Sequence, residues 1–186
     1  MAKAKLGLKD LSAVENHSLR SAYREKLLEH LFSGLVMKHV WLSGIIQLEI
    51  LTPQVDDGGY DLVFEMNSIV RHVQLKSTSS DSKVARFNIN TGLVEKPGGC
   101  VIVIKFDKST LDFGPFLWFG GAPGKRLPDL SGYPIAKHTK GNSQGVKLQR
   151  PKLRVVPSSK FERVGTVSEL TKLLFGELPP HKENGT

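Results

Sequence analysis

The stretch that decides the fold is residues 56–80, DDGGYDLVFEMNSIVRHVQLKSTSS. Its two aspartates and two glycines predict a tight turn, because glycine readily adopts positive φ. The segments YDLVFEM at 60–66 and IVRHVQLKS at 69–77 have strand composition, and Asn67 and Ser68 between them are typical of a hairpin turn. The sequence therefore predicts two adjacent antiparallel strands.

Polar residues that could bind a metal or take part in catalysis lie within this predicted hairpin. Asp61 is near the start of the first strand, and the triplet Gln74-Leu75-Lys76 follows thirteen residues later in the second. Side chains alternate between the faces of a strand, so Gln74 and Lys76 share one face while Leu75 points the other way. If the register of the two strands places Asp61 on the same face, the side-chain oxygens of Asp61 and Gln74 could bind Mg²⁺. Lys76 beside them could polarise a water. The alternative is a structural hairpin in which Asp61 caps a turn and Lys76 is solvated.

A helix is predicted over residues 18–38, with Ser18 as its N-cap. Its apolar residues recur at helical spacing: Leu19, Tyr23, Leu27, Leu28, Leu31, Phe32 and Leu35. Glu25 is expected just inside the edge of this apolar arc, and Glu29, one turn on, just outside it. A carboxylate at the edge of a buried face needs a partner or a metal, but two solvated glutamates on an amphipathic helix fit the same pattern.

The remaining segments predict an α/β fold. Strands are expected at 45–51, 100–106, 113–119, 153–156 and 161–164, and a closing helix at 167–175 with a capping box from Thr166 to Glu169. We expect a single domain over residues 1–177, with a central mixed β-sheet flanked by terminal helices, and a flexible tail at 178–186. Its core would span about residues 18–106, and a glycine-rich and basic loop region about 120–163.

Composition favours an ordinary folded protein in the cytoplasm. Apolar residues make up 39% of the chain and charged residues 24%, which is not the balance of a disordered segment. The only cysteine, Cys100, begins an apolar run and is expected to be a buried structural thiol. The N-terminal residues lack the apolar region of a secretory signal, and no apolar run reaches the length of a membrane span.

Positive charge is concentrated in one part of the sequence. Residues 136–163 carry eight Lys or Arg and one acid, so this segment supplies +7 of the formal net charge of +8. Such a stretch is typical of a protein that binds a polyanion, because neutralised phosphates release their counterions. A solvated surface that aids solubility is the alternative. The candidate phosphate-binding residues are Lys125, Arg126, Lys137, Lys140, Lys147, Arg150, Lys152 and Arg154.

The motif GYDLV followed by VQLKS resembles the PD-(D/E)XK, or restriction-endonuclease-like, nuclease superfamily in its QxK variant. The similarity is greatest to Mrr-like uncharacterised bacterial proteins with a D-G-G-x-D-L and V-Q-x-K-S-T signature. The resemblance covers residues 18–106 and implies a restriction-endonuclease-like core: a helix, a strand, a hairpin and a further strand. It gives little detail from about residue 113 onward.

This resemblance implies a Mg²⁺- or Mn²⁺-dependent endonuclease that hydrolyses DNA. Asp61 would be the principal metal ligand, Gln74 would occupy the position of an acidic ligand, the Leu75 carbonyl would add an oxygen, and Lys76 would be the catalytic lysine. Glu25 is the better match to the assisting carboxylate on the first helix, with Glu29 in reserve. The chain departs from the pattern where no proline directly precedes the aspartate and where glutamine replaces a carboxylate.

Two other functions remain open on these residues. A catalytically inactive protein of the same fold would bind nucleic acid without cutting it. A protein-interaction component of a defence or toxin system would bind neither DNA nor RNA. If the chain cuts both strands of a duplex, two sites are needed, so a homodimer is expected.

Overall fold

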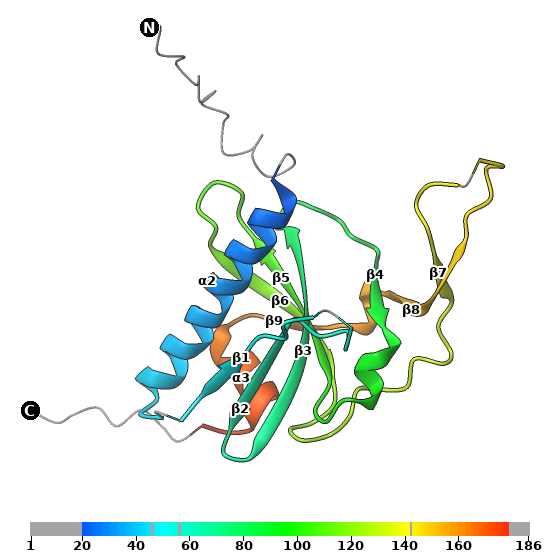
Figure 1. Cartoon of the computed structure of the whole chain (residues 1–186). Helices are drawn as coiled ribbons and strands as arrows, with labels where there is room; N and C mark the ends of the chain where they lie inside the picture. The colour runs from blue at the N-terminus through cyan, green and yellow to red at the C-terminus, as the bar shows by residue number, and fades with distance from the viewer. Residues whose placement is uncertain (1–19, 46, 56, 142, 179–186) are drawn as a thin grey trace, which may run out of the picture.

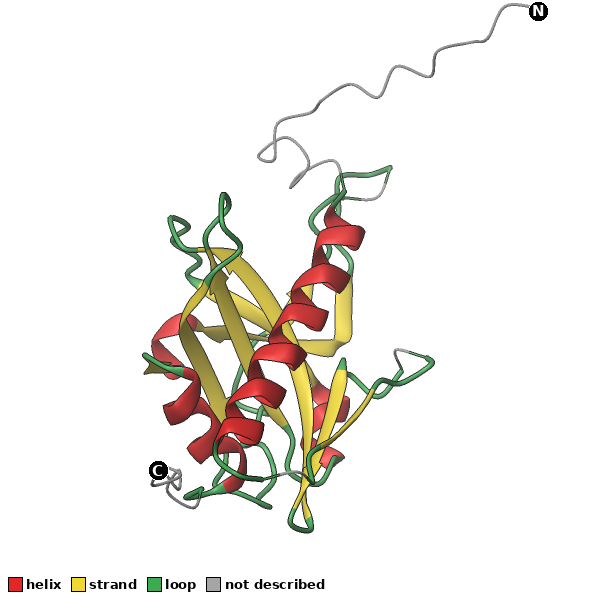
Figure 2. Cartoon of the chain, turned by 90° about the vertical axis from the view of Figure 1, so that its left-hand side faces the viewer, coloured by secondary structure: helices red, strands yellow, loops and turns green. Residues whose placement is uncertain are grey.

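The computed structural model describes residues 20–178 apart from 46, 56 and 142, and these form three layers (Figures 1 and 2). The middle layer is a mixed six-stranded sheet in the order β1-β2-β3-β5-β6-β9, in which β3 and β5 run parallel. Its strands are β1 (Glu49–Leu51), β2 (Leu62–Met66), β3 (Ile69–Ser79), β5 (Cys100–Phe106), β6 (Phe113–Gly120) and β9 (Glu162–Val164). The predicted α/β class with a central mixed sheet is confirmed.

The outer layers are two helices and a smaller sheet. The helices α2 (Ser21–Leu42) and α3 (Val167–Phe175) pack on one face of the main sheet. The second sheet, in the order β4-β8-β7, packs on the other face. Its strands are β4 (Arg86–Asn90), β7 (Ile135–Lys137) and β8 (Gln149–Pro157), and two short 3-10 helices are η1 (Thr91–Glu95) and η2 (Ser158–Lys160).

Strand β5 divides the interior into two cores. Cys100, Ile102 and Ile104 belong to the core beneath the helices, whereas Val101 and Val103 belong to the core beneath the small sheet. All five side chains are buried, as expected for a β-branched run at the centre of a sheet. Burial raises the pKa of the Cys100 thiol to about 12, so this residue is the predicted inert structural thiol.

The predicted hairpin is present as β2 and β3. Their pairing runs from Met66 opposite Ile69 to Leu62 opposite Val73, and the two turn residues adopt positive φ of 50° and 62°. Two consecutive residues with positive φ make a turn whose twist matches that of the strands. The first strand begins two residues later than predicted, and the second extends to Ser79.

Arg71 on β3 joins the hairpin to the last helix. Its side chain is fully buried, and its guanidinium donates to the carbonyls of Leu173 and Leu174 at 2.6 Å each and to that of Gly121 at 3.1 Å. Two of these carbonyls end α3, where helices leave acceptors unpaired and favour a cation. The guanidinium also lies 5.4 Å from the ring centroid of Trp118. Burial lowers the Arg71 pKa, but an arginine remains charged.

The closing helix was predicted in full. The Thr166 hydroxyl accepts from the Glu169 backbone at 3.2 Å, and the Glu169 carboxylate accepts from the Thr166 backbone at 3.2 Å. Gly176 follows with a positive φ of 88°, as a C-terminal glycine should. The predicted tail lies outside the described residues, except for Leu178.

Two other segments differ from prediction. Within the region 120–163, β8 begins at Gln149, four residues before the predicted strand at 153–156, and pairs with both β4 and β7, a short strand that was not predicted. The predicted strand at 45–51 is confined to the three residues of β1. Its neighbours Ile45 and Leu48 pack on the helix-side core without joining the sheet.

Candidate functional site

The candidate site forms where β2 and β3 separate. The last paired residues are Leu62 and Val73, and just beyond them the Asp61 backbone donates to the Val73 carbonyl at 2.8 Å. The Asp61 carboxylate accepts a hydrogen bond from the Leu75 backbone at 2.6 Å. The carboxylate therefore replaces the strand partner that this N–H would otherwise lack.

A glycine turn directs the chain into this arrangement. Gly59 has a φ of +74°, and a Cβ added there would lie 2.5 Å from Cγ of Asn90. Both the backbone conformation and the lack of space exclude a larger residue. The turn thus places Asp61 at the point where the hairpin opens.

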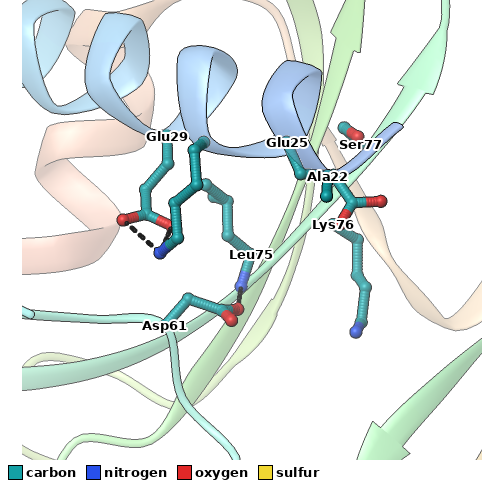
Figure 3. A pocket seen from close by; sticks show the side chains of 8 residues that line it. Ala22, Glu25, Glu29, Asp61, Leu75, Lys76 and Ser77 are labelled. Atoms are coloured by element: carbon teal, nitrogen blue, oxygen red, sulfur yellow. Dashed lines mark hydrogen bonds and ion pairs between the residues drawn. The ribbon is translucent and has the colours of Figure 1, made fainter. Parts of the chain in front are cut away.

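A pocket of about 460 Å³ opens at this point, between the start of α2 and β3 (Figure 3). Its walls carry three carboxylates, two lysines and a hydroxyl. The lining residues are Ala22, Glu25, Lys26, Glu29, Asp61, Leu75, Lys76 and Ser77. The structure therefore brings together Asp61, Lys76 and both predicted helix carboxylates.

The two helix glutamates have the reverse of their predicted burial. The Glu29 side chain is 9% exposed and that of Glu25 is 65% exposed. The stripe that α2 buries consists of Leu28, Glu29, Phe32, Val36 and Val40. This stripe is rotated from the predicted arc and leaves Tyr23 and Leu31 exposed, so Glu29 lies on the side that faces the sheet. Ser18, the predicted N-cap, lies outside the described residues.

The buried glutamate is already paired within the pocket. Lys26 contacts both Glu29 carboxylate oxygens, at 2.8 and 3.0 Å, and both residues line the same pocket as Asp61. A buried carboxylate needs such a partner, because its desolvation is costly. The i, i+3 spacing of Lys26 and Glu29 is the one sequence signal that could have indicated this arrangement.

Gln74 occupies a different place from the pocket residues. It is 7% exposed, and its Oε1 accepts from the Asn90 backbone at 3.2 Å. Its β5 neighbour is Val101, which belongs to the core beneath the small sheet, whereas the neighbour of Leu75 is Ile102 in the helix-side core. Gln74 therefore ties β3 to β4. Gln74 does not line the pocket, so the structure does not bring it together with Asp61 and Lys76. Its role as a metal ligand stays a prediction.

Lys76 shares the face of Gln74, as alternation predicts, but it also reaches the pocket rim. Its β5 neighbour is Val103. The ion pairs formed among the described residues do not include Lys76. In the view of Figure 3 its ammonium group lies on the other side of Asp61 from Glu29. The lysine is therefore a cation that can serve an anionic ligand.

The pocket offers a set of hard oxygen donors. Within the described part of the chain, no group of three or more His, Cys, Asp and Glu side chains is already arranged around a metal position. The donors that line the pocket are nevertheless carboxylates and a hydroxyl, the chemistry that Mg²⁺ and Mn²⁺ prefer. Asp61, Glu25 and Glu29 fit such an ion by donor type, with Glu29 first having to part from Lys26.

Six of the eight predicted phosphate-binding residues lie on one hairpin. Lys137, Lys140, Lys147, Arg150, Lys152 and Arg154 belong to β7, β8 and the residues that join them. Lys152 forms an exposed ion pair with Asp57 at 3.3 Å. Lys125 and Arg126 lie apart from this hairpin, on the loop after β6, where Arg126 pairs with Glu95 at 3.4 Å.

Comparisons of the chain with protein-family models, with curated proteins and with solved structures found no match in any of the three. Among the described residues, none of the helices combines the length and apolar character needed to cross a bilayer.

Proposed function

We propose that this chain is a metal-dependent, endonuclease-like phosphodiesterase that acts on DNA. Its central residues would be Asp61 and Lys76, with Gln74 and Glu25 in the supporting positions that the resemblance to the PD-(D/E)XK superfamily implies. The fold would then be restriction-endonuclease-like and the protein cytoplasmic.

One observation carries this proposal. At the point where two antiparallel strands separate, the Asp61 carboxylate and Lys76 line the same pocket as two carboxylates from a helix. Separated strands give a ligand access to polar groups that a continuous sheet would cover. Strand pairing fixes Lys76 on β3, and hydrogen bonds to Leu75 and Val73 fix Asp61 just before β2.

The oxygen donors decide which metal the pocket would take. Asp61, Glu25, Glu29 and the Leu75 carbonyl would hold Mg²⁺ or Mn²⁺, and Gln74 would join them in the predicted ligand set. Such an ion, when bound, lowers the pKa of a coordinated water and offsets charge on the phosphate.

The side chains of the protein would divide the remaining work. The Lys76 ammonium would stabilise negative charge that develops on the phosphoryl oxygens. Leu75 N–H would keep the Asp61 carboxylate in one orientation, because the 2.6 Å hydrogen bond restricts its rotation. Glu29 would be released for a ligand role if an approaching anion drew Lys26 away from it.

A second candidate function is nucleic-acid binding without cleavage. It is favoured by the Lys26–Glu29 pair, which neutralises one carboxylate of the pocket, and by the hydrogen bond that Gln74 already makes. The same hairpin of basic residues would serve this function. A component that binds only a protein partner is the third.

The test is cleavage of supercoiled plasmid DNA by the full chain with Mg²⁺, Mn²⁺ or chelator. We expect metal-dependent nicking that falls at least about 100-fold in Lys76→Ala, because a preorganised charge stabiliser is removed. Lys38→Ala is the matched control, since Lys38 is an exposed lysine of α2 outside the pocket. Equal activity of the two variants would contradict the proposed role of Lys76.

Binding at low salt separates the three functions. DNA binding without cleavage under any metal would favour the inactive binding protein. The absence of affinity for both DNA and RNA would exclude both nucleic-acid functions and leave the protein-interaction component.

A further inference from the structure

The hairpin formed by β7 and β8 stands out from the body of the protein (Figure 1). We call residues 135–157 the basic hairpin. Its outer part is open to solvent, because every described residue from 138 to 150 is exposed. The inner end of β8 is held differently, since it pairs with β4 and contributes the buried Val156 to the second core.

Backbone pairing holds the outer part together. Lys137 pairs with Gln149 and Ala136 with Arg150, and the His138 backbone donates to the Leu148 carbonyl at 2.9 Å. A two-stranded ribbon that buries little of its own side chains is only marginally stable in water. The outer part of the basic hairpin, which we also call the arm, therefore adds little to the core and leaves most of its surface accessible to a ligand.

The charge of the basic hairpin identifies the kind of ligand. The hairpin contains six Lys or Arg, and the wider segment 130–161 contains no Asp or Glu. Among the described residues, the carboxylate paired with this arm is Asp57, at its base, in an ion pair whose side chains are 76% and 82% exposed. Uncompensated cations on both strands of a ribbon favour a polyanion that can surround them.

The shape of the basic hairpin narrows the choice among polyanions. Beyond Lys137 the chain can extend by at most about 20 Å before it turns back, taking about 3.3 Å per residue. The major groove of B-form DNA, about 12 Å wide and 8.5 Å deep, admits a two-stranded ribbon of this kind. The major groove of duplex RNA is too deep and narrow for side chains to read.

Two exposed apolar side chains agree with this groove. Val146 and Leu148 are 54% and 57% exposed and lie between the cations of the arm. In the major groove an apolar side chain can contact the thymine methyl group, while neighbouring lysines and arginines reach phosphates or guanine.

We propose that the basic hairpin enters the major groove of duplex DNA, which makes double-stranded DNA the substrate class. The inference rests on the proposed function for what happens at the pocket, but the binding step can be measured without cleavage. The hairpin would set the position of the duplex, and the pocket would act on a phosphodiester of it.

The test compares binding of the full chain to a duplex DNA, its single strands and a duplex RNA of the same sequence, with chelator present. The triple variant Lys140→Gln, Lys147→Gln and Arg150→Gln removes three cations from the arm. The control Lys38→Gln, Lys83→Gln and Lys172→Gln removes the same charge from exposed positions elsewhere.

We expect the wild-type chain to prefer duplex DNA. The hairpin triple should lose at least about tenfold in affinity at 100 mM salt, and the salt slope of log K should fall by about 3, one for each phosphate that is no longer neutralised. The control triple should bind within about twofold of wild type. Netropsin, which fills the minor groove, should leave binding unchanged.

Several results would overturn the inference. They are equal loss in the two triples, equal or tighter binding of single-stranded DNA or duplex RNA, or release of the protein by netropsin. Hairpin-dependent duplex binding without cleavage by any metal would support this inference while the proposed catalytic function failed.

Discussion

The hairpin of β2 and β3 and the hairpin of β7 and β8 differ in burial and in charge. The first lies in the middle layer, and its residues are held by the helix-side core, by Arg71 and by the Leu75–Asp61 hydrogen bond. The second projects into solvent and consists largely of exposed basic residues. The comparison indicates that the chain separates a rigid pocket, where atoms must be placed accurately, from an arm, where charge and reach suffice.

The largest effect on stability is expected from Arg71→Leu. The change leaves the carbonyls of Gly121, Leu173 and Leu174 without their donor, so we expect a loss of about 3 to 5 kcal/mol in the free energy of unfolding. Urea unfolding followed by far-UV circular dichroism measures it. Arg86→Leu, at an exposed position of β4, is the matched control and should cost less than about 0.5 kcal/mol. A similar small cost at Arg71 would show that the first hairpin is not held as described.

A smaller effect is expected from Gln74→Leu. The Asn90 N–H loses its acceptor, which should destabilise the fold by about 1 to 3 kcal/mol. Gln74→Glu keeps an acceptor oxygen for the Asn90 N–H but buries a carboxylate, so its free energy of unfolding should rise toward the wild-type value as the pH is lowered and the carboxyl is protonated. If the leucine variant is as stable as wild type, Gln74 does not anchor β4.

The glutamate variant also tests the predicted metal ligand. A carboxylate binds Mg²⁺ more strongly than an amide oxygen, so Gln74→Glu should lower the Mg²⁺ concentration needed for half-maximal cleavage if this side chain belongs to the ligand set. An unchanged requirement would assign Gln74 to structure alone.

The smallest effect on stability is expected from the hairpin triple Lys140→Gln, Lys147→Gln and Arg150→Gln. These side chains are exposed and outside both cores, so the free energy of unfolding should change by less than about 0.5 kcal/mol while DNA affinity falls. Thermal unfolding and binding measured on one preparation provide the comparison. A loss of stability that matches the loss of affinity would show that the arm is part of the folded core.

The fold could be predicted where local sequence decides the structure. The apolar run from Cys100, the turn at Asn67 and Ser68, and the capping box of Thr166 and Glu169 each specify their element without distant partners. The alternation of Phe87 and Ile89 in β4 carried a usable strand signal that was missed. Strand β7 carried almost none, because it is three residues long and is defined by its pairing with β8.

The sequence predicted which residues line the site better than it predicted how their side chains are arranged. The sequence placed Asp61 and Lys76 on neighbouring strands, and both line the pocket. It could not decide which helix glutamate is buried, because Glu25 and Glu29 differ by only about 40° around the helix, and the packing of α2 on the sheet decides between them. Nor could it show that the Asp61 carboxylate binds the Leu75 N–H, which depends on where β2 leaves β3.

The most direct measurement is cleavage and binding of one duplex DNA by wild type and Asp61→Asn, across a titration of Mg²⁺. Asparagine retains an oxygen for the Leu75 N–H and removes the charge, so the fold and the basic hairpin should be preserved. The account predicts that cleavage falls at least about 100-fold while duplex affinity in chelator stays within about twofold. Metal-dependent cleavage at the wild-type rate by Asp61→Asn would contradict it.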